Sequence, residues 1–130
     1  LPYIDILVAS SEFPEKLTGI ADKRQALIKI HDKYGCAVAG VTLGEQGSML
    51  YCGGEFIETP GFAVPGGCKD TTGAGDSYRV GLLYGLLTGR SVEESEMTCT
   101  RGAKPERRLG SRIDRLRSTC RVLTLSVSHI

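Results

Sequence analysis

The 130-residue sequence lacks the features that mark several common classes of protein. No stretch approaches the roughly 18 apolar residues of a membrane-spanning helix, and no basic segment precedes a short apolar run as in a signal peptide. There is no internal repeat and no low-complexity segment. What remains is an apolar content of 41%, which is ordinary for a soluble globular domain, and we expect no membrane partner.

Cysteine is present without the spacing that metal or redox motifs need. The five cysteines are odd in number and widely spaced, with no C-x-x-C pair among Cys36, Cys52, Cys68, Cys99 and Cys120. A zinc site or a redox motif is therefore not expected. We expect reduced thiols in a cytoplasmic protein.

Charge is distributed unevenly along the chain. Residues 1–100 carry 8 basic and 13 acidic side chains, a net of −5, and residues 101–130 carry 8 basic and 2 acidic, a net of +6, which together give the overall +1. We therefore expect residues 98–130 to be a divergent basic tail. A divergent helix, a shift of the reading frame and a nucleic-acid arm are alternative interpretations of the tail. Because no aromatic residues are interleaved with its arginines, we expect no nucleic-acid partner.

Hydrophobic periodicity predicts alternating strands and helices in the first half of the chain. The expected elements are a strand over residues 3–9, helices over 12–17 and 22–34, a strand over 37–43, and a hairpin of strands 48–52 and 55–59 around two glycines. This alternation favours a layered α/β domain with a largely parallel sheet. Since the chain enters its first strand at once and has no initiator Met, we expect a fragment of a longer protein.

A loop and two more helices are expected further along. Residues 60–69 are rich in Gly and Pro and predict a loop. A helix is expected to begin within residues 73–76 and to run to about Leu87 before Gly89. Ser91 and Glu94 have the spacing of a capping box, which predicts the start of the next helix.

A glycine-rich segment carries the clearest chemical signal. It reads Asp-Thr-Thr-Gly-Ala-Gly-Asp at residues 70–76 and leads into the predicted helix. A helix N-terminus presents unpaired N–H groups and a partial positive charge, which suit a phosphate, and glycines let those groups approach the anion. A carboxylate at Asp76 would lie about where an attacking hydroxyl loses its proton. Positioning, an anion site and one base are what phosphoryl transfer to an alcohol requires.

Two other interpretations apply to the same residues. In the first, Asp76 is only a first-turn helix acid and the glycines form a tight turn. The second is a dinucleotide-binding turn, which the absence of a G-x-G-x-x-G pattern argues against.

Residues 70–76 resemble the C-terminal signature of ribokinase-like (PfkB) carbohydrate kinases. The resemblance implies transfer of the γ-phosphate of ATP to an alcohol group of a sugar or sugar-like small molecule, with Asp76 as general base. It implies an anion hole formed by Gly73, Ala74 and Gly75, and ATP and Mg²⁺ as cofactors. The implied fold is the ribokinase-like three-layer αβα sandwich, of which this chain would be the incomplete C-terminal part.

The same resemblance suggests a cation site and further ATP contacts. Asp70 and Thr72 match positions where many family members bind a monovalent cation such as K⁺, although Asp70 could equally cap the turn through its side chain. Val-Thr-Leu-Gly-Glu-Gln-Gly-Ser at residues 41–48 resembles the element that lies along the nucleotide. It implies ATP contacts at Thr42, Gly44 and Gly47.

The first strand ends in a segment that departs from the family. Residues 8–12 resemble the family's Asn-x-x-Glu element, which helps to place Mg²⁺ and phosphate. Glu12 is present, but Ala9 stands where the family has Asn. Glu12 is therefore expected either to have a Mg²⁺-linked role or to be a helix-start acid.

The resemblance covers residues 3–96, and we expect the nucleotide-binding part of the kinase to span residues 1–97. The family's N-terminal half, which supplies most of the sugar site, has no counterpart in this chain. Which sugar or alcohol accepts the phosphate therefore stays open. Whether the full-length parent forms a homodimer stays open as well. A catalytically incompetent fragment that retains nucleotide binding is the alternative to an active kinase.

Overall fold

The computed structural model describes residues 4–61, 66, 73–100 and 122–124. In chain order its elements are β1 (Ile6–Ser10), α1 (Phe13–Thr18), α2 (Lys23–Tyr34), β2 (Val38–Thr42), the 3-10 turn η1 (Gly44–Gln46), β3 (Ser48–Cys52), β4 (Glu55–Thr59), α3 (Ala74–Leu87), α4 (Val92–Thr100) and β5 (Val122–Thr124). Among the described residues, no helix combines the length and the apolar content needed to cross a bilayer.

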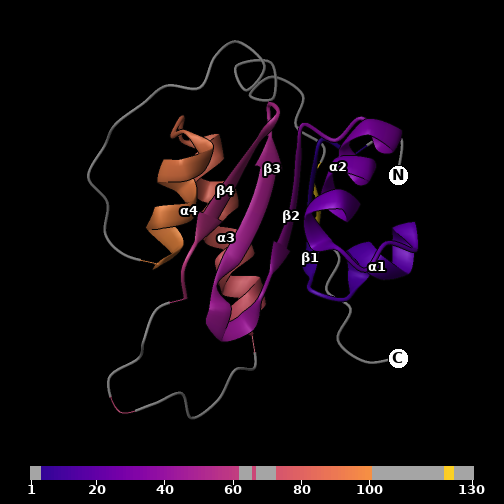
Figure 1. Cartoon of the computed structure of the whole chain (residues 1–130). Helices are drawn as coiled ribbons and strands as arrows, with labels where there is room; N and C mark the ends of the chain where they lie inside the picture. The colour runs from indigo at the N-terminus through magenta and orange to yellow at the C-terminus, as the bar shows by residue number, and fades with distance from the viewer. Residues whose placement is uncertain (1–3, 62–65, 67–72, 101–121, 125–130) are drawn as a thin grey trace.

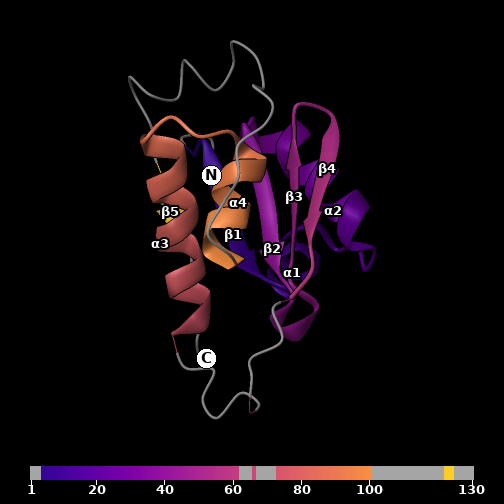
Figure 2. The same ribbon diagram turned by 90° about the vertical axis from the view of Figure 1, so that its left-hand side faces the viewer.

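The described elements form three layers. A sheet in the order β4-β3-β2-β1-β5 lies between α1 and α2 on one face and α3 and α4 on the other (Figures 1 and 2). Strand β1 pairs in parallel with β2 and with β5, whereas β2, β3 and β4 pair antiparallel. The expected α/β fold class with a three-layer αβα arrangement is confirmed. The described sheet is not largely parallel, however, because the hairpin of β3 and β4 gives it two antiparallel pairings beside the two parallel ones.

Strands β1 and β2 lie in the middle of the molecule and are covered on both faces. Four of the five residues in each strand are buried, which explains their nearly continuous apolar sequences. Because successive side chains of a strand point to opposite faces, the two strands contribute to two separate cores. The core under α3 and α4 contains Ile6, Val8, Val38, Leu50, Cys52, Leu82, Leu86 and Val92. The core under α2 contains Ile4, Leu7, Leu27, Ile30, Cys36, Ala39 and Val41.

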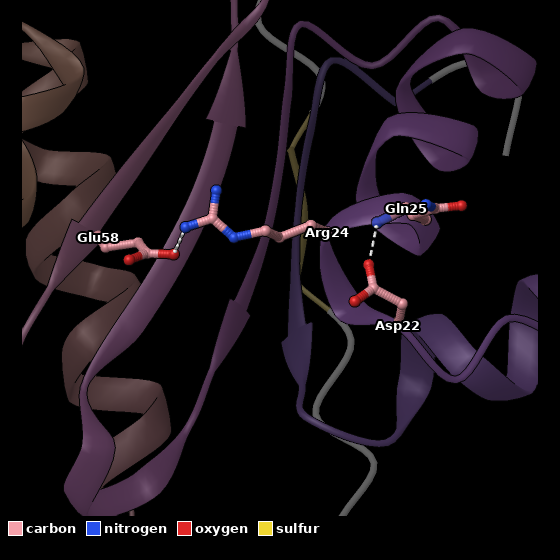
Figure 3. A network of polar contacts seen from close by, with 4 residues as sticks. All are labelled: Asp22, Arg24, Gln25 and Glu58. Atoms are coloured by element: carbon pink, nitrogen blue, oxygen red, sulfur yellow. Dashed lines mark hydrogen bonds and ion pairs between the residues drawn. The ribbon is translucent and has the colours of Figure 1, made fainter.

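Helix α2 is held at its start and against the hairpin. The Asp22 side chain accepts a hydrogen bond of 2.8 Å from the backbone N–H of Gln25 and so caps the helix (Figure 3). Arg24 forms an ion pair with Glu58 on β4, and its guanidinium lies 4.7 Å from the centre of the Phe56 ring. The contacts of Arg24 bridge α2 and the edge strand β4, on the antiparallel side of the sheet.

Local signals predicted most of these boundaries. Gly35 takes the left-handed conformation that ends α2, and the hairpin strands β3 and β4 have the predicted bounds. The capping box at the start of α4 is confirmed, because the Glu94 amide donates to the Ser91 hydroxyl oxygen and the Glu94 carboxylate accepts from the Ser91 amide. Strand β5 was not expected from the sequence; it comes from the basic tail and pairs with β1.

Helices α3 and α4 approach each other closely at one glycine. A Cβ atom at Gly85 would lie 2.5 Å from the Ser95 Oγ and 2.8 Å from the Ser95 Cα. Such distances are shorter than van der Waals contact, and backbone atoms cannot give way as a flexible side chain can. Gly85 therefore sets how closely α4 packs on α3.

Gly85→Ala should destabilise the chain because the added methyl forces α4 away from α3. The expected loss in the free energy of unfolding is about 1–3 kcal/mol, as for overpacked cores. The matched control is Gly75→Ala in the same helix, where a Cβ atom would make an ordinary 3.5 Å contact with the Arg79 guanidinium. The control should be neutral or up to about 1 kcal/mol more stable. Urea unfolding measures both, and a Gly85→Ala chain as stable as the control would contradict this account of the helix packing.

Candidate functional site

At one end of the sheet, where β1 and β2 finish, two segments that are far apart in the sequence lie at the same end of the molecule. Ser10 at the end of β1 is in register with Thr42 at the end of β2, and Thr42 with Ser48 at the start of β3. Ser48 is in turn opposite Thr59 at the end of β4. The start of α3 lies toward the same end of the strands, which is the lower end in both views (Figures 1 and 2). The predicted nucleotide loop and the predicted anion hole therefore share one end of the molecule.

Helix α3 begins as the sequence predicts. Gly73 is its N-cap with φ +80°, a conformation that glycine adopts without strain, and no side chain caps the helix in the described part of the chain. Gly73 and Ala74 are exposed, and a Cβ atom at Gly73 would meet none of the described residues within 4 Å. A helix N-terminus that no described side chain caps or covers fits an anion such as a phosphate.

Asp76 lies in the first turn of α3 and has a partner that the sequence analysis missed. Its Oδ1 accepts a hydrogen bond of 2.9 Å from Nη1 of Arg79, one turn along the helix. The Asp76 side chain is 62% exposed and the Arg79 side chain only 7%. Within the described residues, Nε of Arg79 is buried without a partner. The i,i+3 spacing of an acid and a base on one helix was the available signal.

The connection between β2 and β3 holds the three predicted ATP contacts. The Thr42 hydroxyl faces β1, where it donates a long hydrogen bond of 3.5 Å to the Ala9 carbonyl. Gly44 has φ +60° and is exposed, and a Cβ atom there would meet none of the described residues within 4 Å. Gly47 has φ +100°, and a Cβ atom there would lie 1.9 Å from the Thr59 carbonyl oxygen. Packing against β4 thus requires glycine at position 47, whatever else this residue contacts.

The structure places Glu12 in a surface ion pair. Glu12 is the N-cap residue of α1, and its Oε2 accepts a hydrogen bond of 2.9 Å from Nζ of Lys16 in the last turn of that helix. The hydrogen bond and the positive charge of Lys16 lower the pKa of the Glu12 carboxyl. The described residues contain no group of three or more His, Cys, Asp or Glu side chains that could hold a metal ion. The other two predicted ligands, Asp70 and Thr72, lie outside the described residues.

The comparisons with known proteins identify a family. The sequence model of the pfkB family carbohydrate kinases matches residues 1–97. A fructokinase from Escherichia coli is 33% identical over 98 residues, which are 75% of this chain and 31% of the fructokinase. The chain thus spans about a third of the length of such relatives.

Solved structures agree with this match. An adenosine kinase from Sinorhizobium meliloti superposes with a TM-score of 0.63 and 38% identity, over 71% of this chain and 27% of the adenosine kinase. A fructokinase from Vibrio cholerae, determined with fructose, ADP and a calcium ion bound, gives a TM-score of 0.64 and 29% identity, over 73% of this chain and 32% of the fructokinase.

The pairing of Asp76 with a buried guanidinium has a measurable consequence for stability. Asp76→Asn removes the counter-charge of Arg79 and should lower the free energy of unfolding by about 1 kcal/mol, less than for a fully buried pair because Asp76 is exposed. Arg79→Met removes the buried charge together with its unpartnered Nε and should be nearly neutral. In the Arg79→Met background, Asp76→Asn should then cost only about 0.3 kcal/mol, the contribution of a first-turn acid through the helix dipole. Chemical denaturation of the four chains tests this cycle, and an equal cost in both backgrounds would show that the two residues are not coupled.

Proposed function

This chain belongs to the pfkB family of carbohydrate kinases, and on that basis we propose that it is the nucleotide-binding, phosphoryl-transfer part of an ATP-dependent kinase. The proposed reaction moves the γ-phosphate of ATP to an alcohol group of a sugar or sugar-like substrate. The observation that carries the proposal is the uncapped start of α3, with an exposed carboxylate in its first turn. The proposed domain spans residues 1–97, followed by the divergent basic tail of residues 98–130, from which β5 joins the sheet beside β1.

The proposed chemistry needs an anion site and one base. The backbone N–H groups at Gly73, Ala74 and Gly75 would stabilise the negative charge that develops on the transferred phosphoryl group. Asp76 would accept the proton of the attacking hydroxyl as its oxygen bonds to the γ-phosphorus, and the bond from that phosphorus to ADP breaks. For this role the Asp76 oxygen that accepts from Arg79 stays fixed, while the exposed side of the carboxylate faces solvent and substrate.

The remaining contacts are proposed on the same basis. Thr42, Gly44 and Gly47 would lie along the nucleotide, since the loop between β2 and β3 lies at the same end of the sheet as the start of α3. Mg²⁺ would arrive with ATP and be held mainly through the phosphates, as is usual for this ion. Glu12 would reach it only by giving up its ion pair with Lys16.

A second candidate function is nucleotide binding without catalysis. The chain spans 31% of the length of the fructokinase that it resembles, so most of a kinase of that size is not represented in it. Binding and turnover therefore need separate experiments.

We expect the 130-residue chain to bind ATP-Mg weakly, with a Kd of about 0.1–1 mM, at the upper end of common KM values. Phosphorylation of sugars should be undetectable, because the sequence has no counterpart of the family's sugar-binding half. Calorimetric titration with ATP-Mg and a coupled ADP assay measure the two properties. Clear kinase activity of the chain alone would contradict this prediction, because it would mean that the 130 residues contain a sugar site.

A charge reversal at the anion hole tests the site itself. Ala74→Asp places a carboxylate at the exposed first position of α3, where it should stabilise the helix but repel phosphate, so ATP affinity should fall at least about tenfold with no loss of stability. Gly53→Asp adds the same charge at the hairpin turn, at the opposite end of the sheet (Figure 1). Its φ of +61° suits the Asp-Gly pair of a hairpin, so this control should keep wild-type affinity. Equal affinities for the two variants would contradict an anion site at α3.

The role of Asp76 as base is testable in a full-length parent kinase that contains this segment. Asp76→Asn keeps the shape of the side chain but removes the base, so kcat should fall by about 10²–10⁴-fold. The Kd for ATP should change little, because the backbone N–H groups of the anion hole are untouched. If Asp76 is only a helix-start acid that pairs with Arg79, the variant should show the same loss of about 1 kcal/mol of stability and keep a near-normal kcat, so kcat is the deciding quantity. A kcat within about threefold of the parent's would rule out the base.

A further inference from the structure

A buried carboxylate joins the two parts of the proposed nucleotide site. Glu96 lies in α4 and has no exposed surface. Its Oε1 accepts hydrogen bonds from the Ser48 hydroxyl at 2.5 Å and from the Tyr78 hydroxyl at 2.8 Å. Its Oε2 accepts a third, from the Thr59 hydroxyl, at 2.8 Å. One side chain therefore binds residues of β3, β4 and α3 from a fourth element.

Two of these hydroxyls fix the loop between β2 and β3. Ser48 follows Gly47 directly and is itself buried. Thr59 belongs to the strand on which the loop packs: a Cβ atom at Gly47 would be 1.9 Å from the Thr59 carbonyl oxygen, and one at Gly61 would be 1.9 Å from the Glu45 carbonyl oxygen. Movement of either hydroxyl would therefore move the loop.

The third hydroxyl fixes the start of α3. Tyr78 is two residues beyond Asp76 and within two turns of the N-cap Gly73. At its other end α3 is held against α4 by the close approach of Gly85 to Ser95, the residue before Glu96. Helix α3 is thus fixed to α4 by a backbone contact and by the hydrogen bond from Tyr78 to Glu96.

We propose that Glu96 is a positioning residue of the nucleotide site, which holds the loop of residues 44–47 and the start of α3 at one separation. Hydrogen bonds to a buried carboxylate are directional and costly to break, because no water replaces a lost partner. Two segments that must contact the same nucleotide would therefore be arranged before it binds. The identity of the ligand rests on the proposed function, whereas the link between the two segments does not.

The link can be tested without nucleotide by amide hydrogen exchange. Tyr78→Phe removes one hydroxyl from α3, and Tyr84→Phe makes the same change at an exposed position of that helix. We expect Tyr78→Phe to speed exchange about tenfold or more at the amides of Gly47 and Ser48 as well as near residue 78, since local opening no longer breaks the bond to Glu96. The Tyr84→Phe control should leave Gly47 and Ser48 unchanged. Faster exchange confined to α3 would overturn the link.

The consequence for binding is tested by titration with ATP-Mg. Tyr78→Phe should weaken the affinity by about 3–10-fold, the loss expected when a site is no longer arranged in advance. Ile30→Val is the second control, because it removes a buried methyl from the other face of the sheet and lowers the melting temperature without contacting Glu96. Its Kd should match that of the wild-type chain. If Tyr78→Phe and Ile30→Val both lose ATP affinity in proportion to their fall in melting temperature, the positioning role of Glu96 is overturned.

A conservative replacement completes the experiment. Glu96→Gln keeps the volume and an acceptor for Ser48 and Tyr78, and its NH₂ group can donate to the Thr59 hydroxyl, so affinity should stay within about threefold of wild type. Glu96→Leu removes the acceptor that the buried Ser48 hydroxyl and the half-buried Thr59 and Tyr78 hydroxyls share, and ATP affinity should fall at least about tenfold. Equal affinity in the Leu and Gln variants would overturn the proposal. Failure of the unmodified chain to bind ATP would instead contradict the proposed function, and amide exchange would still decide whether Glu96 links the two segments.

Discussion

The hydrogen bonds of Glu96 are the interaction on which the arrangement of the site depends. A carboxylate withdrawn from water is tolerated only when its oxygens find donors, and here Ser48, Thr59 and Tyr78 supply them. Satisfying this one group requires α4 to lie over the end of the sheet where β2 meets β3. It also requires α3 to begin beside that end. The position of the glycine-rich helix start thus follows from a need to satisfy buried polar atoms.

The chemistry of that end of the molecule follows from backbone geometry more than from reactive side chains. Glycine at the start of α3 leaves the first-turn amides open, and glycine between β2 and β3 lets the loop pack on β4 without a side chain in between. Asp76 adds a carboxylate, held on one side by the buried guanidinium of Arg79. The anion site that we propose at this helix start, beside the carboxylate of Asp76, would suit phosphoryl transfer, in agreement with the family to which the chain belongs.

Sequence reasoning succeeded where the signals were local. The hairpin around Gly53 and Gly54, the end of α2 at Gly35 and the capping box of Ser91 each depend on residues within a few positions of one another. It missed the pairing of β5 with β1 and the contacts of Glu96, whose partners Ser48 and Thr59 come from a different part of the chain. Nothing in a single sequence indicates that a glutamate in a helix with acidic neighbours will be buried. That outcome is decided by tertiary packing.

The most direct test of the account is an NMR titration of the ¹⁵N-labelled chain with ATP-Mg. The shared site predicts that the largest amide shift changes occur together in two places, at residues 73–76 and at residues 42–47. They should saturate with one Kd, because a single ligand would cause both. Changes confined to another surface, such as the exposed side of α2, or two sets of changes with different midpoints, would contradict a single nucleotide site between the loop and α3.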